Sequence, residues 1–186
     1  MQQFAGARDC FLGEPRGKRF ALTWAWHPKA LPTAVPASAA IAAARLGMEV
    51  VVTRPPAFDL DPDDMSIIHR IASESGGSVQ LCDDIDAGVA GADAVYVKSW
   101  GSLQAFGRPE EERALREPFR EWRLTERRLR RTRNGRGIAM HCLPVRRNVE
   151  IDDAVLDGPN SVVVDEAENR LHAQRALLLE IMGGVR

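Results

Sequence analysis

The sequence predicts an α/β fold built on a doubly wound, Rossmann-like parallel sheet, and three observations support this prediction. Short apolar runs alternate with segments of helical periodicity along most of the chain. The apolar runs are nearly continuous, as in parallel strands that are covered on both faces. Glycines and prolines that form turns separate the segments. Right-handed crossovers between such strands give a single domain with helices on both faces of the sheet.

The first half of the chain contains two strands and two helices in alternation. Arg19–Trp24 is an apolar run that predicts the first strand. Val35–Leu46 is rich in alanine and is followed by a glycine, which predicts a helix. Met48–Thr53 predicts a second strand, which two prolines stop soon afterwards. Asp63–Ser73 predicts a second helix, because an Asp-Pro-Asp sequence begins it and two glycines follow it.

Shorter segments continue the alternation in the second half. Further strands are expected at Ser78–Leu81, Asp93–Val97, Gly137–His141 and Ser161–Val164. A brief helix is expected between the first two of these strands, at Asp84–Ala90.

Two longer segments are also expected to be helical. Pro109–Arg133 is charged, with interruptions expected at Pro118 and near Thr125. Ten arginines lie between residues 113 and 136, which is conceivable for a nucleic-acid-binding helix, but the interleaved glutamates favour a solvated, salt-bridged helix. Leu171–Met182 is expected to form the terminal helix, and acidic residues precede it where they complement the helix dipole.

The composition limits the possible functions. The 186 residues carry a formal net charge of −1, so the chain as a whole favours neither nucleic acid nor an anionic membrane. No apolar run approaches the length of a membrane span, and the first residues do not resemble a secretory signal. The three cysteines form no CxxC pair or zinc pattern, which predicts reduced thiols in the cytoplasm and no metal site. No GxGxxG or P-loop sequence occurs, so neither NAD nor ATP is expected as a cofactor.

The most informative motif is HCLPVRRN, at His141–Asn148. Pro144 has no amide donor and ends strand pairing, which places Cys142 just past the carboxyl end of a strand. Ligands bind at that edge of open α/β sheets. A thiol, exposed backbone groups and two arginines at this edge suit a small anionic substrate. The alternative interpretation is a buried cysteine before an ordinary turn.

A second motif, DEAENR, occupies Asp165–Arg170. It lies between an apolar run and the terminal helix, so Arg170 falls near the start of that helix. Helix capping, with Arg170 solvated, is one interpretation of this segment. A site for an anion at Arg170 is the other.

Together, these two motifs resemble the HCLP and EAENR motifs of the aspartate/ornithine carbamoyltransferase family. The Arg-Arg-Asn tail of the first motif and the KSWG sequence at Lys98–Gly101 are similar to the branch that acts on N-acylated ornithines. The resemblance implies transfer of a carbamoyl group from carbamoyl phosphate to N-acetyl- or N-succinylornithine, a step of arginine biosynthesis. It implies no metal or redox cofactor.

The resemblance also assigns roles to individual residues. Cys142 and Arg170 match catalytic positions of the family, and with Leu143 they face the carbamoyl group or its phosphate. Lys98 and Leu143 face the acylornithine. Ordinary ornithine enzymes have a different loop here, with an aspartate for the free α-amino group. Acylation removes that positive charge, and a lysine then suits the remaining α-carboxylate.

Two residues depart from the pattern of the acetylornithine enzymes. Glu150 stands where those enzymes carry a lysine that can be carboxylated, and a glutamate supplies a similar charge; its other interpretation is the start of a helix. Pro32 stands where they have an asparagine, as in the succinylornithine type, so the acyl group stays open. Arg146 and Glu150 are further substrate-binding candidates. His27 and Lys29 either face the substrate or belong to a solvated loop.

The resemblance covers only the second domain of such an enzyme, because the first domain's Ser-x-Arg-Thr and His-Pro-Cys-Gln motifs do not occur. We expect residues 15–186 to form the amino-acid-binding domain and residues 1–14 to be a remnant of the interdomain helix. The chain alone is expected to be inactive, the intact enzyme to be a homotrimer, and the terminal helix to expose apolar residues. The alternative is a non-catalytic amino-acid-binding module, or a split subunit that needs a separate carbamoyl-phosphate-binding partner.

Overall fold

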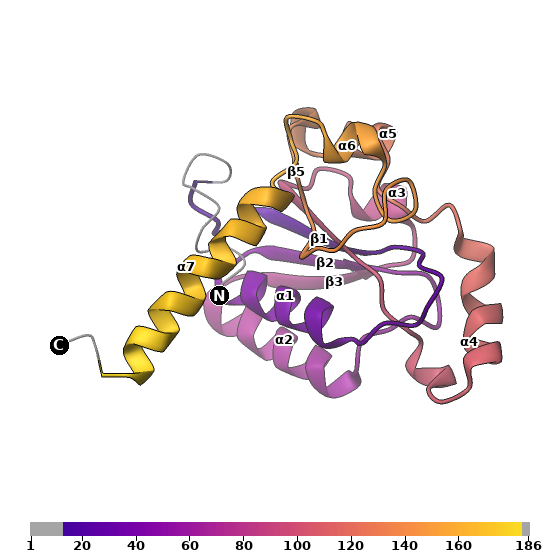
Figure 1. The fold of residues 1–186 in the computed structure, drawn as a ribbon, viewed down its shortest axis with the longest axis horizontal. Helices are drawn as coiled ribbons and strands as arrows, with labels where there is room; N and C mark the ends of the chain where they lie inside the picture. Colours follow the sequence, from indigo (N-terminus) through magenta and orange to yellow (C-terminus); the bar gives the residue numbers. More distant parts are fainter. Residues whose placement is uncertain (1–12, 184–186) are drawn as a thin grey trace.

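The structure, a computed structural model, describes residues 13–183 and contains a five-stranded parallel sheet in the order β3-β2-β1-β4-β5 (Figure 1). The strands are β1 Arg19–Trp24, β2 Glu49–Thr53, β3 Ser78–Cys82, β4 Ala94–Lys98 and β5 Ile138–Met140. The predicted α/β class and parallel sheet are therefore confirmed. The expected remnant helix at residues 1–14 lies almost entirely outside the described residues.

Helices cover both faces of the sheet. Helices α1 (Ala34–Arg45) and α2 (Pro62–Ser75) pack side by side on one face. The short helices α3 (Ile85–Gly88), α5 (Glu126–Leu129) and α6 (Asp153–Leu156) lie on the opposite side (Figure 1). The alanines of α1 bring its backbone close to the strands, and four of them are completely buried: Ala39, Ala40, Ala43 and Ala44.

The start and stop signals of α2 act as the sequence predicts. The Asp61 side chain accepts a hydrogen bond of 2.9 Å from the Asp63 amide, which caps the first turn. Gly76 ends the helix in the left-handed conformation, at φ 77°, which costs a glycine little.

The charged segment Pro109–Arg133 is interrupted where the sequence predicts, but it is not one long helix. It divides into α4 (Pro109–Arg116), a 3-10 turn at Glu117–Phe119, and α5. The Thr125 hydroxyl caps α5 by accepting a 3.2 Å hydrogen bond from the Arg128 amide. The segment is also less solvated than expected, because α4 buries the ion pair between Glu112 and Arg116.

The strand predicted at Ser161–Val164 is wrong. Only Ser161 forms a bridge, to Ala139, and the Val162 amide donates a 3.0 Å hydrogen bond to the Ala139 carbonyl. Helix α7 then begins at Val163, eight residues before the predicted start. Val162 and Val163 still enter the core, at 2% and 6% exposure, although Val164 is left 72% exposed. The apolar run alone could not distinguish these outcomes.

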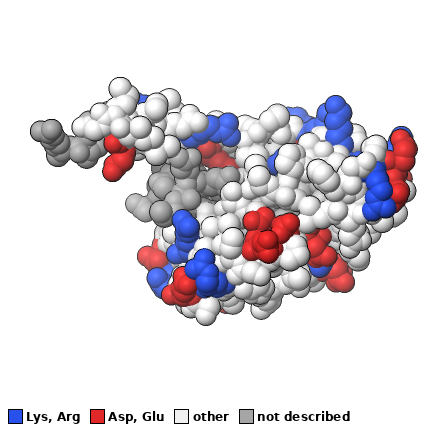
Figure 2. All heavy atoms as spheres, turned by 90° about the horizontal axis from the view of Figure 1, so that it is seen from below, with Lys and Arg blue, Asp and Glu red and all other residues white. Residues whose placement is uncertain are grey.

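Helix α7 (Val163–Ile181) is the longest element and runs out from the body of the domain (Figure 1). Its apolar residues are exposed as predicted, by 51% to 80%, at Leu177, Leu178, Ile181 and Met182. Figure 2 shows this helix as a projection with few charged side chains on the visible side. Within the described residues, no helix has the length and apolar character needed to cross a membrane. The remaining elements are 3-10 turns at Leu103–Ala105 and Arg133–Gly135.

Candidate functional site

Three loops meet at the carboxyl edge of the sheet, where β1, β4 and β5 end. Trp24 at the end of β1 lies beside Lys98 at the end of β4, and Tyr96 of β4 pairs with Met140 of β5. The chain winds from β1 towards β3 on one side and from β4 to β5 on the other, so the order reverses between β1 and β4. Crevices at such reversals bind ligands in open α/β sheets.

The HCLP motif forms the loop after β5. Cys142 and Leu143 are partly buried, and Leu143 has a φ of 49°, an uncommon conformation for a leucine. The Leu143 amide donates a 3.0 Å hydrogen bond to Nδ1 of the buried His141, which fixes the start of the loop. Cys142 therefore lies just past the carboxyl end of the strand, as the sequence predicts.

Arg170 comes to this loop from α7. Its Nη2 donates a 3.0 Å hydrogen bond to the Cys142 carbonyl, so the two motifs meet although 28 residues separate them in sequence. The Arg170 side chain is otherwise exposed, as a residue available to an anion must be.

Glu150 is buried beneath the same loop, at 2% exposure. One of its oxygens accepts a 2.9 Å hydrogen bond from the Arg146 amide, and the other lies 3.5 Å from Nε2 of His141. Burial raises the pKa of Glu150, but the contact with His141, the Arg146 amide and the positive charge of Lys98 together hold that pKa below its usual value. Glu150 is therefore a carboxylate at neutral pH. It faces His141 and Arg146 and is not presented to solvent.

The structure brings all six predicted site residues to one edge of the sheet. Lys98 is half-buried at the end of β4, close enough to influence Glu150, and Glu150 contacts Arg146 through its backbone. Cys142, Leu143 and Arg170 complete the set from the loop after β5 and from α7.

His27 joins this network through a partner that no sequence pattern indicates. Nε2 of His27 accepts a 3.0 Å hydrogen bond from Nε of Arg146, across 119 residues of sequence. The His27 carbonyl accepts another, of 3.0 Å, from the buried Arg116. The loop after β1 is thus tied to the loop after β5 and to α4. Lys29, the other candidate of this loop, is exposed, and its carbonyl and amide lie 2.9 and 3.0 Å from Nδ1 of His27, which can bond only one of them.

Sequence reasoning missed a second buried acid under Cys142. Glu166 of α7 is 8% exposed and lies against Tyr96, which is completely buried on β4. Burial raises the pKa of Glu166 to about 7, although the Tyr96 hydroxyl, the His141 amide and the charge of Arg170 oppose the rise. Burial, together with Glu166 and Cys142, likewise raises the pKa of Tyr96. The acidic motif predicts the start of a helix, but this pattern does not distinguish the buried Glu166 from its more exposed neighbours.

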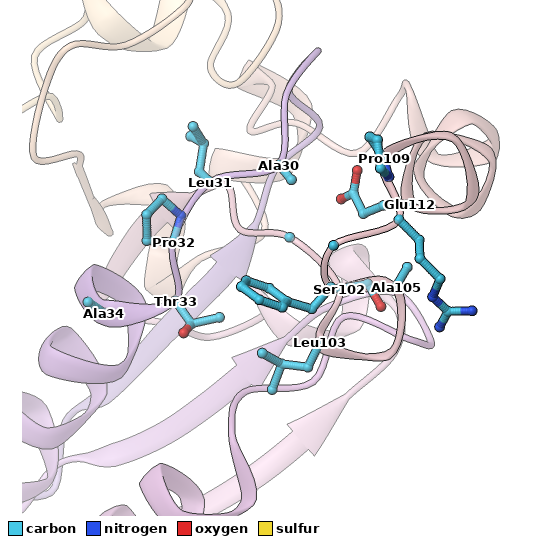
Figure 3. Close-up of a pocket in the computed structure, with 14 residues that line it drawn as sticks. Ala30, Leu31, Pro32, Thr33, Ala34, Ser102, Leu103, Ala105, Pro109 and Glu112 are labelled. Atoms are coloured by element: carbon cyan, nitrogen blue, oxygen red, sulfur yellow. The ribbon is translucent and has the colours of Figure 1, made fainter.

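A pocket of about 500 Å³ opens beside this network, between the loops that follow β1 and β4. Figure 3 shows residues 30–34 along one side and residues 102–112 along the other. Across the part of the chain that the structure describes, no group of His, Cys, Asp and Glu side chains is arranged to hold a metal ion.

Comparison with known proteins gives consistent matches. Residues 23–181 match the aspartate/ornithine carbamoyltransferase family, in its Asp/Orn binding domain. The N-acetylornithine carbamoyltransferase of Xanthomonas campestris is 47% identical over 169 residues, which are 90% of this chain and 49% of that protein. The chain therefore spans about half the length of the relatives that it matches.

Solved structures match equally well. A crystal structure of acetylornithine transcarbamylase complexed with acetylcitrulline superposes with a TM-score of 0.86 at 47% identity, covering 89% of this chain and 49% of that one. A variant of N-acetyl-L-ornithine transcarbamylase, complexed with carbamyl phosphate and N-succinyl-L-norvaline, matches with the same TM-score and identity, covering 89% and 50%.

Proposed function

This chain belongs to the aspartate/ornithine carbamoyltransferase family, and from that membership we propose that it is the amino-acid-binding half of an N-acylornithine carbamoyltransferase. The complete reaction transfers a carbamoyl group from carbamoyl phosphate to the δ-amino nitrogen of an N-acylornithine and releases phosphate. The observation that carries the proposal is the hydrogen bond from Arg170 to the Cys142 carbonyl, because it joins the family's two motifs at the expected sheet edge.

In this proposal, the carbamoyl phosphate side of the site contains Cys142, Leu143 and Arg170. The reaction needs a polarised carbonyl and stabilisation of the charge on the departing phosphate. The Arg170 guanidinium supplies a positive charge that is exposed on one side and fixed on the other by Cys142. Cys142 and Leu143 position the carbamoyl group, so orientation contributes in addition to charge.

The amino-acid side of the proposed site contains Lys98, with Leu143 between the two substrates. Lys98 offers an ammonium to the α-carboxylate of the acylornithine. Glu150 does not compete for an α-ammonium, because it is buried and both of its oxygens face His141 and the Arg146 amide. Arg146 and Glu150 act together, with Glu150 holding the Arg146 backbone and His27 holding its guanidinium.

The chain alone is proposed to be incomplete, because it spans about half of its relatives. The other half then supplies most contacts with carbamoyl phosphate, and the complete enzyme is a cytoplasmic homotrimer. The alternative proposal is a non-catalytic amino-acid-binding module or a split subunit. One result separates the binding module from the other two possibilities: when the first half of a relative is supplied, a split subunit or an enzyme fragment makes acylcitrulline, and a binding module makes none.

The proposal predicts that the chain binds N-acetyl-L-ornithine at least tenfold more tightly than L-ornithine. Acetylation removes the α-ammonium, for which Lys98 provides only repulsion. Calorimetric titration of the purified chain with each ligand measures the ratio.

Lys98→Met should abolish the preference, and Lys29→Met, which changes an exposed lysine in the loop after β1, should leave it unchanged. Tighter binding of L-ornithine by the unaltered chain contradicts the N-acylornithine assignment.

A further inference from the structure

The pocket between the loops after β1 and β4 contains none of the six proposed site residues, yet it lies at the point where the strand order reverses. Its volume of about 500 Å³ is within the range of small-molecule sites in proteins. Its walls are fixed to each other by a 2.8 Å hydrogen bond from the Gly101 amide to the Leu31 carbonyl. They are also tightly packed, since a side chain at Gly101 would approach Ala30 Cβ to 2.9 Å.

The lining of the pocket is mainly apolar. Leu31 and Pro32 lie on one side, and Leu103 and Ala105 lie on the other (Figure 3). Phe106 also lines it and is 85% exposed, an unusual position for a phenyl ring. Apolar side chains left exposed around a hollow are typical of a surface that covers an apolar ligand.

The lining contains two buried polar groups, of which one lacks a described partner. The Ser102 hydroxyl is in a residue 3% exposed, and no described atom pairs with it. The Glu112 carboxylate, in a residue also 3% exposed, is paired with the guanidinium of Arg116. Buried polar groups are normally paired, so the Ser102 hydroxyl is a candidate contact for a neutral ligand group.

The pocket offers a single positive charge among its described lining residues, and that charge is already paired. Arg108 is the single cation among its described lining residues. Its guanidinium donates a 2.6 Å hydrogen bond to Glu111 and another to the Gln104 carbonyl. A ligand carboxylate would therefore face apolar groups, Glu112 and a guanidinium already paired with Glu111, so its desolvation would be poorly compensated.

We propose that this pocket receives the acyl substituent of the amino-acid substrate and selects an uncharged, apolar acyl group longer than acetyl. The inference rests on the proposed function, in which Lys98 binds the α-carboxylate. Lys98 is three residues from the pocket wall at Gly101, so at most about 11 Å separates their backbones. A substituent on the α-nitrogen thus has the pocket within reach, and the Ser102 hydroxyl donates to the acyl carbonyl.

The test is calorimetric titration of the 186-residue chain with a series of N-acyl-L-norvalines. The series comprises the acetyl, butanoyl, hexanoyl and succinyl derivatives, of which succinyl matches butanoyl in length but carries a carboxylate. Burial of methylene groups predicts a gain in affinity of about tenfold for each step of two methylenes. The succinyl derivative should bind at least tenfold more weakly than the butanoyl derivative.

Two variants test whether this pocket causes the trend. Ala34→Phe fills the pocket from an exposed position of α1, and should reduce the ratio of hexanoyl to acetyl affinity at least tenfold. Phe106→Ala removes an apolar wall without disturbing the core, and should reduce it about threefold. The matched control is Ala87→Phe, at an exposed position of α3 outside the pocket, which should leave the ratio unchanged.

Different results overturn the proposed function and the pocket assignment. If no N-acyl-L-norvaline binds, the proposed function itself is overturned, and the inference with it. If they bind with equal affinity at every chain length, if succinyl binds most tightly, or if Ala34→Phe leaves the ratio unchanged, the proposed function stands and the pocket assignment is overturned.

Discussion

His27 holds Arg146 in a way that fixes the proton on its own ring. Because Nε of Arg146 can only donate, Nε2 of His27 must accept, so the proton of the neutral ring lies on Nδ1. Nδ1 then donates to the Lys29 carbonyl, 2.9 Å away, and cannot also accept from the Lys29 amide, which lies 3.0 Å from the same nitrogen. A protonated ring would place two donors against each other, and Arg146 would lose its support. The position of a candidate substrate-binding arginine therefore depends on a neutral histidine.

Glu166 predicts a pH dependence of stability. Its pKa is raised from 4.5 to about 7, so the folded state binds a proton more readily than the unfolded state. The stability that neutral Glu166 contributes is fully present below pH 4.5 and is lost as the pH rises through about 7. A shift of this size corresponds to roughly 3 kcal/mol. Glu166→Gln, which stays neutral, should have a free energy of unfolding above that of the unaltered chain at pH 8 and close to it at pH 4.5.

Urea unfolding at both pH values measures this difference. Glu168→Gln, at an exposed position of the same helix, is the control and should change neither value. An equal effect of Glu166→Gln at both pH values would show that its titration does not control stability.

Among the helices, α3 depends on a single glycine. A Cβ at Gly88 would lie 2.1 Å from Oγ1 of Thr53, the buried last residue of β2. Gly88→Ala should therefore destabilise the chain by about 1–3 kcal/mol, although alanine is the better helix former. Chemical unfolding of this variant measures the cost. In a Thr53→Ala background, the same substitution should cost much less, and an unchanged cost would mean that contact with Thr53 is not its cause.

The sequence predicts elements well where a local signal begins or ends them. Asp61 and Gly76 mark the limits of α2, and Pro118 and Thr125 mark the breaks between α4 and α5, all by local chemistry that the sequence displays. The valines at 162 and 163 carry no such signal. A strand and a helix could both bury them, so contacts elsewhere in the fold determine that a helix forms here and that no strand pairs with β5.

Some features of the candidate site can likewise be predicted from the sequence, and others cannot. Strand ends place Lys98 and Cys142 at one edge, because carboxyl ends of parallel strands meet, and this can be predicted from sequence. His27 contacts Arg146, and Glu166 contacts Tyr96, across long stretches of sequence. These contacts depend on where the side chains point in the folded chain, and neither residue spacing nor periodicity predicts that.

For the molecule as a whole, the exposed side of α7 predicts self-association of the isolated chain. Apolar side chains that are more than half exposed favour burial against another surface. The double variant Leu178→Glu, Ile181→Glu should lower the sedimentation coefficient at high protein concentration to that of a monomer. Its free energy of unfolding should change by less than about 0.5 kcal/mol, since these residues lie outside the core.

Leu115→Glu, on the exposed side of α4, is the matched control and should leave association unchanged. If the unaltered chain sediments as a monomer at every concentration, the exposed face of α7 does not drive association.

The same helix also acts as a lever. In its first turn Val163 and Glu166 are buried, Arg170 follows in the second turn, and the exposed leucines lie near the far end of a rod about 28 Å long. A tilt of about 5° around the buried turn moves the far end by roughly 2 Å but moves Arg170 by much less. A contact that fixes the position of the far end therefore fixes the tilt of the helix. The guanidinium of Arg170, beside Cys142, is then held in place more closely than the far end itself.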